Sequence, residues 1–152
     1  MSTLTSVAEK FINQSNKNVF LTGKAGTGKT TFLKSIVQST HKKLVVVAPT
    51  GIAAINASGV TIHSMFQLPF GAHLPAEDLG FFDGARVTSR KHVRKGLKFS
   101  AQKQRMLREL ELLIIDEASM VRSDLLDLID FVLRFVRKKG NVPFGGVQVL
   151  FV

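Results

Sequence analysis

The eight residues GKAGTGKT, from Gly23 to Thr30, have the types and spacing of a phosphate-binding loop. They match G-x-x-x-x-G-K-[ST] at every fixed position. Glycines let the backbone bend so that several N–H groups converge on an anion at a helix N-terminus. Lys29 is expected to reach the outer phosphates, and the Thr30 hydroxyl is expected to ligate Mg²⁺. The expected phosphate-binding set is Gly23, Ala25, Gly26, Thr27, Gly28, Lys29, Thr30 and Thr31.

Two adjacent carboxylates follow an apolar run later in the chain. In LLIIDE, residues 112–117, Asp116 ends the run and Glu117 comes next. Asp116 is expected to hold the Mg²⁺ shell and Glu117 to polarise an attacking water, although an aspartate can also simply cap the turn after a strand. The adjacent glutamate favours hydrolysis over transfer to a small-molecule acceptor. A dinucleotide site does not fit, because Thr31 stands where its third glycine would be.

Alternating strands and helices must position these residues. Apolar runs predict strands at 19–22, 43–51, 111–119 and 145–152. Helical patterns predict helices at 5–14, 29–38 and 52–57, and further helices after Thr61 and after Ser123. Ser6 and Glu9 have capping-box spacing. Ser123 is expected to cap the last helix and Gly140 to end it. The alternation predicts an α/β fold around a parallel sheet.

The chain has 152 residues, 45% of them hydrophobic, which is enough for one domain with a core. Its formal net charge of +10 favours polyanionic partners, with nucleic acid before acidic membranes. Residues 86–108 hold nine lysines and arginines and no acid, so they indicate either a DNA-binding surface or a solvated charged face. The DNA-binding alternative would use Arg90, Lys91, Arg94 and Lys95, with Phe81, Phe82 and Phe99 as candidate stacking partners.

Other site classes find little support. There is no cysteine, the four histidines lack metal-ligand spacing, and no apolar run is long enough to span a bilayer. The N-terminus lacks the layout of a secretory signal. Residues 69–105, rich in glycine and proline, are expected to form a functional excursion with some short structure of its own.

The segments NVFLTGKAGTGKTT, VVVAPTGIAAINASGVTIHSMF, LLIIDEASMV and VPFGGVQVLFV together resemble the first RecA-like domain of the petite-integration-frequency DNA helicases. These are the RecD-like, 5′→3′ branch of helicase superfamily 1. The resemblance implies a three-layer RecA-like phosphate-loop domain over residues 1–152. It also implies an ATP- and Mg²⁺-dependent motor that translocates 5′→3′ on single-stranded DNA and unwinds duplex junctions, inside the cell and away from membranes.

The same resemblance implies DNA contacts after the second strand. Pro49, Thr50 and Gly51 would touch the strand, and Thr61 and His63 fall where the family has further contacts. From the residues alone, Pro-Thr-Gly could instead be a tight turn, and His63 could be a core histidine bonded to backbone.

Two departures from the family pattern matter. No glutamine stands where such helicases read adenine, since Gln14 is too close to Gly23 and Ser6 is near the expected place. The next family motif would begin after Val152, so we expect a truncated, monomeric motor half whose second RecA-like domain lies elsewhere. An arginine finger from that domain is worth roughly 10³–10⁵ in rate, so little turnover is expected without it. The alternatives are a self-contained small NTPase or nucleotide kinase, and a nucleic-acid-binding module with a structural nucleotide site.

Overall fold

The computed structural model describes residues 3–24, 26–75 and 87–152. The chain forms two compact units. The sheet unit comprises Met1–Thr61, Leu110–Ala118 and Val147–Val152, and the helical unit comprises Ile62–Glu109 and Ser119–Gly146. Within the described ranges, no helix is both long enough and apolar enough to cross a membrane.

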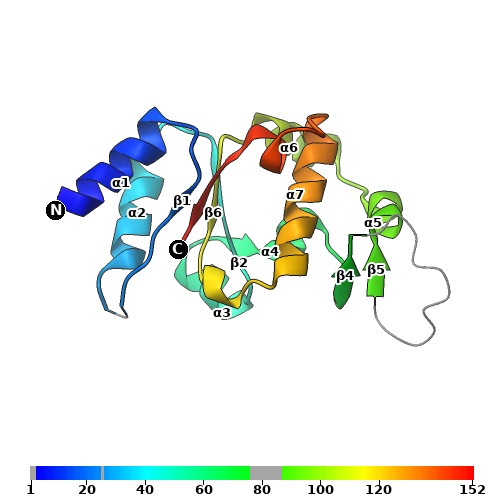
Figure 1. The fold of residues 1–152 in the computed structure, drawn as a ribbon, viewed down its shortest axis with the longest axis horizontal. Coiled ribbons are helices and arrows are strands. Elements are labelled where there is room, and N and C mark those ends of the chain that lie inside the picture. The colour runs from blue at the N-terminus through cyan, green and yellow to red at the C-terminus, as the bar shows by residue number, and fades with distance from the viewer. Residues whose placement is uncertain (1–2, 25, 76–86) are drawn as a thin grey trace. The chain divides into compact units, whose positions relative to one another are not determined.

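Five parallel strands form the sheet of the sheet unit (Figure 1). They are β1 (Val19–Phe20), β2 (Leu44–Ala48), β3 (Val60–Thr61), β6 (Leu112–Ile115) and β7 (Gln148–Phe151). Their order is β1-β7-β6-β2-β3, and every neighbouring pair is parallel. All four residues of β6 are buried, as expected for a central strand with both faces covered. The predicted α/β fold with a parallel sheet is confirmed.

Three helices belong to the sheet unit: α1 (Thr3–Gln14), α2 (Lys29–Ser39) and α3 (Gly51–Asn56). Helix α2 buries Phe32, Leu33 and Ile36 in a core that also contains Ile12 of α1 and the sheet residues Val46, Leu112, Ile114 and Leu150. Ser39 of α2 donates a hydrogen bond to Glu9 of α1 (3.1 Å). The capping box predicted at Ser6 is wrong, because α1 begins at Thr3 and Ser6 lies inside the helix.

A buried glutamine at the start of β7 fixes the chain that leads into β1. The Gln148 side chain accepts from Lys42 Nζ (2.6 Å) and donates to the carbonyl of Lys17 (2.7 Å). Lys42 Nζ also donates to the carbonyl of Ser15 (2.6 Å), and its burial lowers the pKa of the ammonium. Because buried polar groups are costly when unpaired, this network specifies how the end of α1 meets the sheet.

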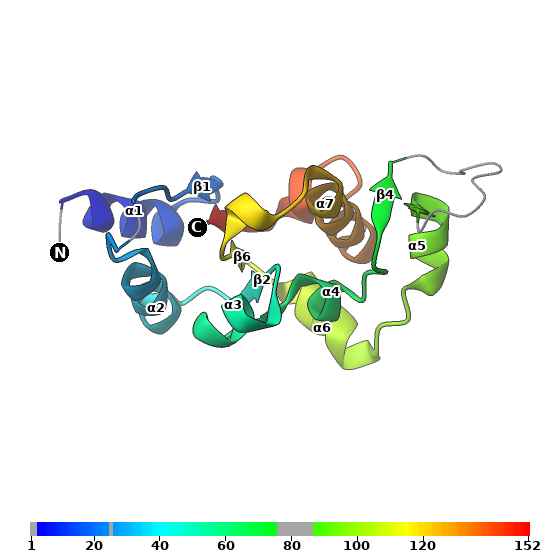
Figure 2. The same cartoon turned by 90° about the horizontal axis from the view of Figure 1, so that it is seen from below.

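The helical unit contains α4 (Ile62–Phe66), α5 (Arg90–Gly96), α6 (Ala101–Glu109) and α7 (Ser123–Arg137). Its short strands β4 (Ala72–Leu74) and β5 (Val87–Ser89) pair in parallel, with His73 opposite Thr88. Helix α5 follows β5 directly and lies beside this pair (Figures 1 and 2). Short elements therefore lie in the described parts of the predicted excursion at 69–105, while its residues 76–86 lie outside the described residues.

The ends of α7 differ from the sequence-based expectation. Ser123 is the first helical residue, and the preceding Arg122 is an N-cap without a side-chain hydrogen bond. Lys138 takes the left-handed C-cap position (φ 55°), two residues before the expected Gly140. The predicted capping roles of Ser123 and Gly140 are therefore wrong. Charged side chains near the two ends still complement the helix dipole.

The short helix η2 (Pro143–Gly146) explains the PFGG sequence. A Cβ on Gly145 would lie 2.7 Å from the carbonyl oxygen of Leu133 in α7, and Gly145 has φ 59°. The backbone of Phe144 donates to Asp130 (2.6 Å). Only glycine fits the close approach of this turn to α7, so the motif is a packing requirement of the helical unit.

Candidate functional site

The loop between β1 and α2 has the backbone conformation that its glycines predict. Gly26 (φ 77°) and Gly28 (φ 86°) both lie in the left-handed region, where side chains are disfavoured. A Cβ on Gly23 would lie 2.8 Å from Thr27 Oγ1. Ala25, the remaining member of the loop in the expected set, lies outside the described residues. The described part of the loop therefore needs glycine at these three positions for geometric reasons.

Lys29 holds its ammonium group over this loop. Its Nζ donates to the carbonyls of Gly23 (2.7 Å) and Lys24 (3.1 Å). Thr27 Oγ1 donates to the carbonyl of Lys24 as well (2.7 Å), which fixes the same peptide. Both acceptors of Lys29 are neutral, and a phosphate oxygen is a stronger partner for an ammonium than a carbonyl. The Lys29 ammonium group therefore lies at the loop that is expected to bind phosphate.

The start of α2 presents backbone N–H groups beside the lysine. Gly28 is the N-cap and supplies no side-chain hydrogen bond. The first N–H groups of a helix have no intrahelical acceptor, so they point at the loop with a partial positive charge. Thr30 and Thr31 lie in this first turn and are exposed. A hydroxyl at Thr30 fits a metal that also binds phosphate oxygens.

A pocket of about 300 Å³ opens at this place. Its lining includes Gly23, Thr27, Gly28 and Lys29 from the loop and Phe32 from α2. Leu4 and Thr5 of α1 line it as well, and Leu21 and Thr22 complete the wall. Helix α1 therefore contributes to the same pocket as the phosphate loop.

The two carboxylates lie at the end of β6. Asp116 is buried, with 9% of its surface exposed, and its N–H donates to the carbonyl of Val47 in β2 (2.9 Å). Glu117 is exposed and left-handed (φ 53°), an uncommon conformation for a residue other than glycine. The next N–H, from Ala118, donates to Val152 beyond β7 (2.8 Å). These bonds turn the chain sharply, so that the buried Asp116 and the exposed Glu117 differ in their access to water.

The strand order brings the carboxylates and the phosphate loop to one edge of the sheet. All five strands are parallel, so the segments that follow β1, β2, β3, β6 and β7 share the carboxyl edge. Strand β7 lies between β1 and β6, which sets their ends about 10 Å apart at ~4.8 Å per strand. A metal–phosphate group fits a gap of this order. Among the described residues, no group of three or more His, Cys, Asp or Glu could hold a metal by itself.

The Pro-Thr-Gly segment follows β2 at the same edge. Thr50 is the N-cap of α3, and its side chain accepts from the N–H of Ala53 (3.2 Å). Pro49 is half-buried, and Gly51 is the exposed first residue of the helix. Thr61 ends the neighbouring strand β3. The segment is therefore a strand-to-helix junction rather than an isolated tight turn, and its DNA contacts stay predictions.

His63 of α4 stacks on an aromatic ring that sequence reasoning missed. The rings of His63 and Phe70 lie 4.7 Å apart at 18°, and Phe70 is 74% exposed. Burial and the nearby Arg122 lower the pKa of His63, so the ring is neutral near pH 7. His63 is thus a half-buried stacking partner. The LPFG sequence, which places an aromatic residue between proline and glycine, is the signal that could have identified Phe70.

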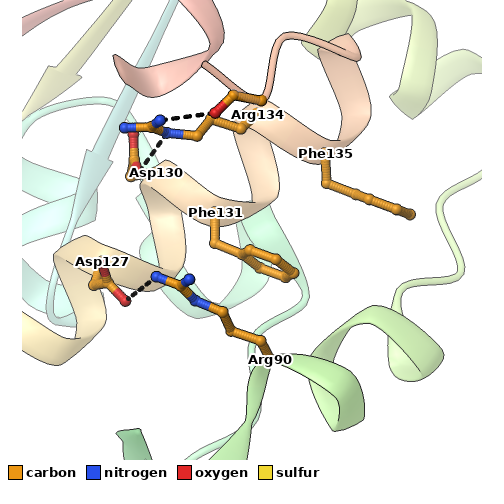
Figure 3. Close-up of a pocket in the computed structure, with 7 residues that line it drawn as sticks. Arg90, Asp127, Asp130, Phe131, Arg134 and Phe135 are labelled. Carbon is orange, nitrogen blue, oxygen red and sulfur yellow. Dashed lines mark hydrogen bonds and ion pairs between the residues drawn. The ribbon is translucent and has the colours of Figure 1, made fainter. Parts of the chain in front are cut away.

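The basic segment is more ordered than a solvated charge run. Arg90 pairs with Asp127 of α7 (3.2 Å) and lies over the Phe131 ring at 5.6 Å (Figure 3). Arg94 lies over the same ring at 5.8 Å. Lys91 and Lys95 are exposed on α5. The structure thus brings Arg90 and Arg94 onto α7, while DNA binding by any of these four side chains stays a prediction.

The aromatic residues of this segment divide into two groups. Phe99 is buried, with 9% of its surface exposed, so its candidacy as a stacking partner for DNA is wrong. Phe99 lies in the turn between α5 and α6 and lines a hollow there. Phe81 and Phe82 lie outside the described residues.

Comparisons with known proteins find relatives that match most of the chain. The family model described as PIF1-like helicase matches residues 1–152. The ATP-dependent DNA helicase PIF1 of Saccharomyces cerevisiae is 36% identical over 143 residues, which are 91% of this chain and 15% of that protein. The ATP-dependent DNA helicase Pif1 of a Psychrobacter species is 39% identical over 142 residues, 91% of this chain and 19% of that protein.

Solved structures of Pif1 helicases are also similar to this chain. A Bacteroides Pif1 bound to single-stranded DNA is 47% identical, with a TM-score of 0.81 over 99% of this chain and 31% of that one. A Bacteroides Pif1 in complex with ADP-AlF4 is 47% identical, with a TM-score of 0.82 and the same coverage. The chain spans less than a fifth of these two curated relatives and about a third of these solved ones. The matched family model and the RecA-like fold show that this chain belongs to the PIF1-like helicase family.

Proposed function

We propose that this chain binds ATP with Mg²⁺ and forms the nucleotide-binding part of an ATP-dependent DNA helicase that moves 5′→3′ on single-stranded DNA and unwinds duplex junctions. One observation carries the proposal. The phosphate loop, the Asp116–Glu117 pair and the Pro49–Gly51 junction all follow parallel strands of one sheet, so they share its carboxyl edge. Ligands bind at this edge in open α/β sheets. The Bacteroides relatives bound to ADP-AlF4 and to single-stranded DNA support both ligands.

Each residue of the proposed nucleotide site has a separate role in ATP hydrolysis. Lys29 balances charge on the outer phosphates, and the N–H groups of the first turn of α2 bind the phosphate oxygens. Thr30 would ligate the Mg²⁺, and Asp116 would hold its outer shell. When bound, Mg²⁺ neutralises charge that develops on the phosphates. Glu117 would accept a proton from the attacking water, and its exposure at the end of the buried strand β6 supports this role.

Motion on DNA requires that the nucleotide site be coupled to a DNA contact. Strands β6 and β2 are direct neighbours, paired from Leu44 opposite Leu112 to Val47 opposite Ile115. The catalytic pair and the Pro49–Gly51 junction follow the ends of these two strands. A shift at the bound phosphate therefore has a short, rigid route to the segment proposed to hold DNA. We further propose a second RecA-like domain as the partner that supplies an arginine finger, and an intracellular location.

The test is steady-state ATP turnover with and without a single-stranded oligonucleotide, using Lys29→Ala as the blank. Glu117→Gln keeps the size of the side chain and removes its basicity, so it should retain ATP binding and lose any turnover that the wild type shows above the blank. Turnover at the blank level, together with measurable ATP binding, supports a site that needs a second domain. Robust turnover without DNA stimulation would favour the self-contained small NTPase. If wild-type turnover exceeds the blank, Glu117→Gln activity equal to wild type would remove the glutamate from the mechanism.

A further inference from the structure

Two adjoining hollows run along α7 in the helical unit and are not used by the proposed function. The first, of about 460 Å³, lies between α7 and the start of α5 (Figure 3). The second, of about 510 Å³, lies against α6 and the turn before it. Both are lined by Arg134 and Phe135. We name these two adjoining hollows together the α7 groove.

An apolar stripe runs along this groove. Phe131 and Phe135 lie one helical turn apart and stack at 6.4 Å and 15°, and both rings project from the same side of α7 (Figure 3). Phe135 is 47% exposed. Leu97 and Val136 continue the lining in the second hollow. A large aromatic side chain held in a concave, partly apolar surface is a typical anchor point for protein partners.

The charges in the groove favour an acidic partner. Its acidic residues already have cationic partners: Asp127 pairs with Arg90 (3.2 Å) and Asp130 with Arg134 (2.7 Å). The second hollow adds two cations, and no acid, from Arg108 and Lys138. The lining therefore carries more positive than negative charge, and the excess lies beside the exposed Phe135.

We propose that the α7 groove binds an acidic peptide segment of a partner protein through a bulky apolar side chain on that segment. The apolar side chain would enter beside Phe135, and the carboxylates would pair with Arg108 and Lys138. A peptide fits better than DNA bases, because stacking needs an open ring face. The face of Phe131 is covered by the guanidinium groups of Arg90 and Arg94, and Phe131 itself stacks against Phe135.

The test is fluorescence anisotropy of the full 152-residue chain with a fluorescein-labelled peptide of aspartates around a central Leu-Phe pair. Two matched peptides carry lysines in place of the aspartates or alanines in place of Leu-Phe. We expect saturable binding of the first peptide alone, weakened by added salt. Phe135→Ala should lower its affinity at least ~10-fold, as for an interface anchor, and Phe135→Leu should recover part of the loss.

Matched controls separate the groove from the rest of the surface. Arg108→Gln should weaken peptide binding, whereas Arg105→Gln, on the same helix but outside the groove, should not. Phe70→Ala removes an exposed ring of the same unit that lies outside the groove, so it should leave peptide binding unchanged. Thermal melting of each variant shows whether it remains folded.

Three results would overturn the proposal: equal affinity for the acidic and the lysine peptide, loss of single-stranded DNA binding rather than peptide binding in Phe135→Ala, and self-association of the chain that Phe135→Ala abolishes. The second would make the groove a nucleic-acid site, and the third would make its occupant a second copy of the chain. Because peptide binding is measured without ATP or DNA, its failure leaves the proposed helicase function unaffected.

Discussion

Replacing Gly51 with alanine should show whether glycine at this position serves the stability of the fold or the binding of DNA. Gly51 is the first residue of α3 and has no positive φ. A Cβ added there would meet no atom within 4 Å. Nothing in the fold therefore requires glycine at this position. If DNA approaches the backbone at Gly51, as we propose, the added methyl group would lie between the helix start and the DNA phosphate.

The two expected effects have opposite signs. Alanine is favoured over glycine by about 1 kcal/mol inside a helix, and at the first position about half of this, ~0.5 kcal/mol, should be gained. For a chain of this size, that corresponds to a rise in melting temperature of roughly 1–2 °C. Losing one charge-assisted contact to phosphate costs about 1.5–3 kcal/mol, so affinity for single-stranded DNA should fall roughly 10–100-fold.

The assay pairs thermal melting with fluorescence anisotropy of a labelled oligothymidine at constant salt. Gly140→Ala is the control, because a Cβ there also meets no atom within 4 Å and Gly140 lies in the other unit, after α7. It should change DNA affinity little. A stabilised Gly51→Ala variant with unchanged DNA affinity would refute the close approach of DNA to this backbone. A clearly destabilised variant would refute the structural reasoning itself.

Two further predictions concern stability. A Cβ on Gly59 would lie 2.4 Å from the carbonyl oxygen of Val46, and this backbone atom cannot move aside easily. Gly59→Ala should therefore lower the free energy of unfolding, measured in urea, by about 3 kcal/mol. A loss under ~1 kcal/mol would contradict this prediction. Burial lowers the pKa of His73 below its ordinary value of 6.5, so the unfolded chain takes up a proton first and stability should fall as pH drops below about 6.5. His73→Leu should reduce this loss while His92→Leu, at an exposed position, should not; an unchanged pH dependence in His73→Leu would contradict the assignment.

The sequence predicted those parts of the fold that depend on the conformational preferences and burial of a few neighbouring residues. Left-handed turns favour glycine, so GKAGTGKT predicted the loop and its helix, and Gly26 and Gly28 have the expected conformation. Strands buried on both faces require continuous apolar runs, so LLIID predicted β6 and the buried Asp116. In both cases a few neighbouring residues determine the outcome.

Features that depend on distant residues could not be predicted in the same way. The insertion of β7 between β1 and β6 is set by tertiary pairing, which apolar content does not encode. The pairing of Arg90 with Asp127 of α7 also depends on tertiary structure. It makes part of the basic segment pack on α7, which the sequence of that segment alone does not indicate. Lys138 takes a left-handed C-cap although Gly140 was available, because the turn that follows is fixed by packing against α7.

The central claim is that the loop from Gly23 to Thr30 binds the phosphates of ATP. Isothermal titration calorimetry of the chain with ATP, with and without Mg²⁺, tests it most directly, with Lys29→Ala as the matched variant. We predict Mg²⁺-dependent binding by the wild type and a loss of at least ~100-fold in Lys29→Ala, from about 3 kcal/mol of charge-assisted contact. Equal affinity of the two proteins for ATP would contradict the account.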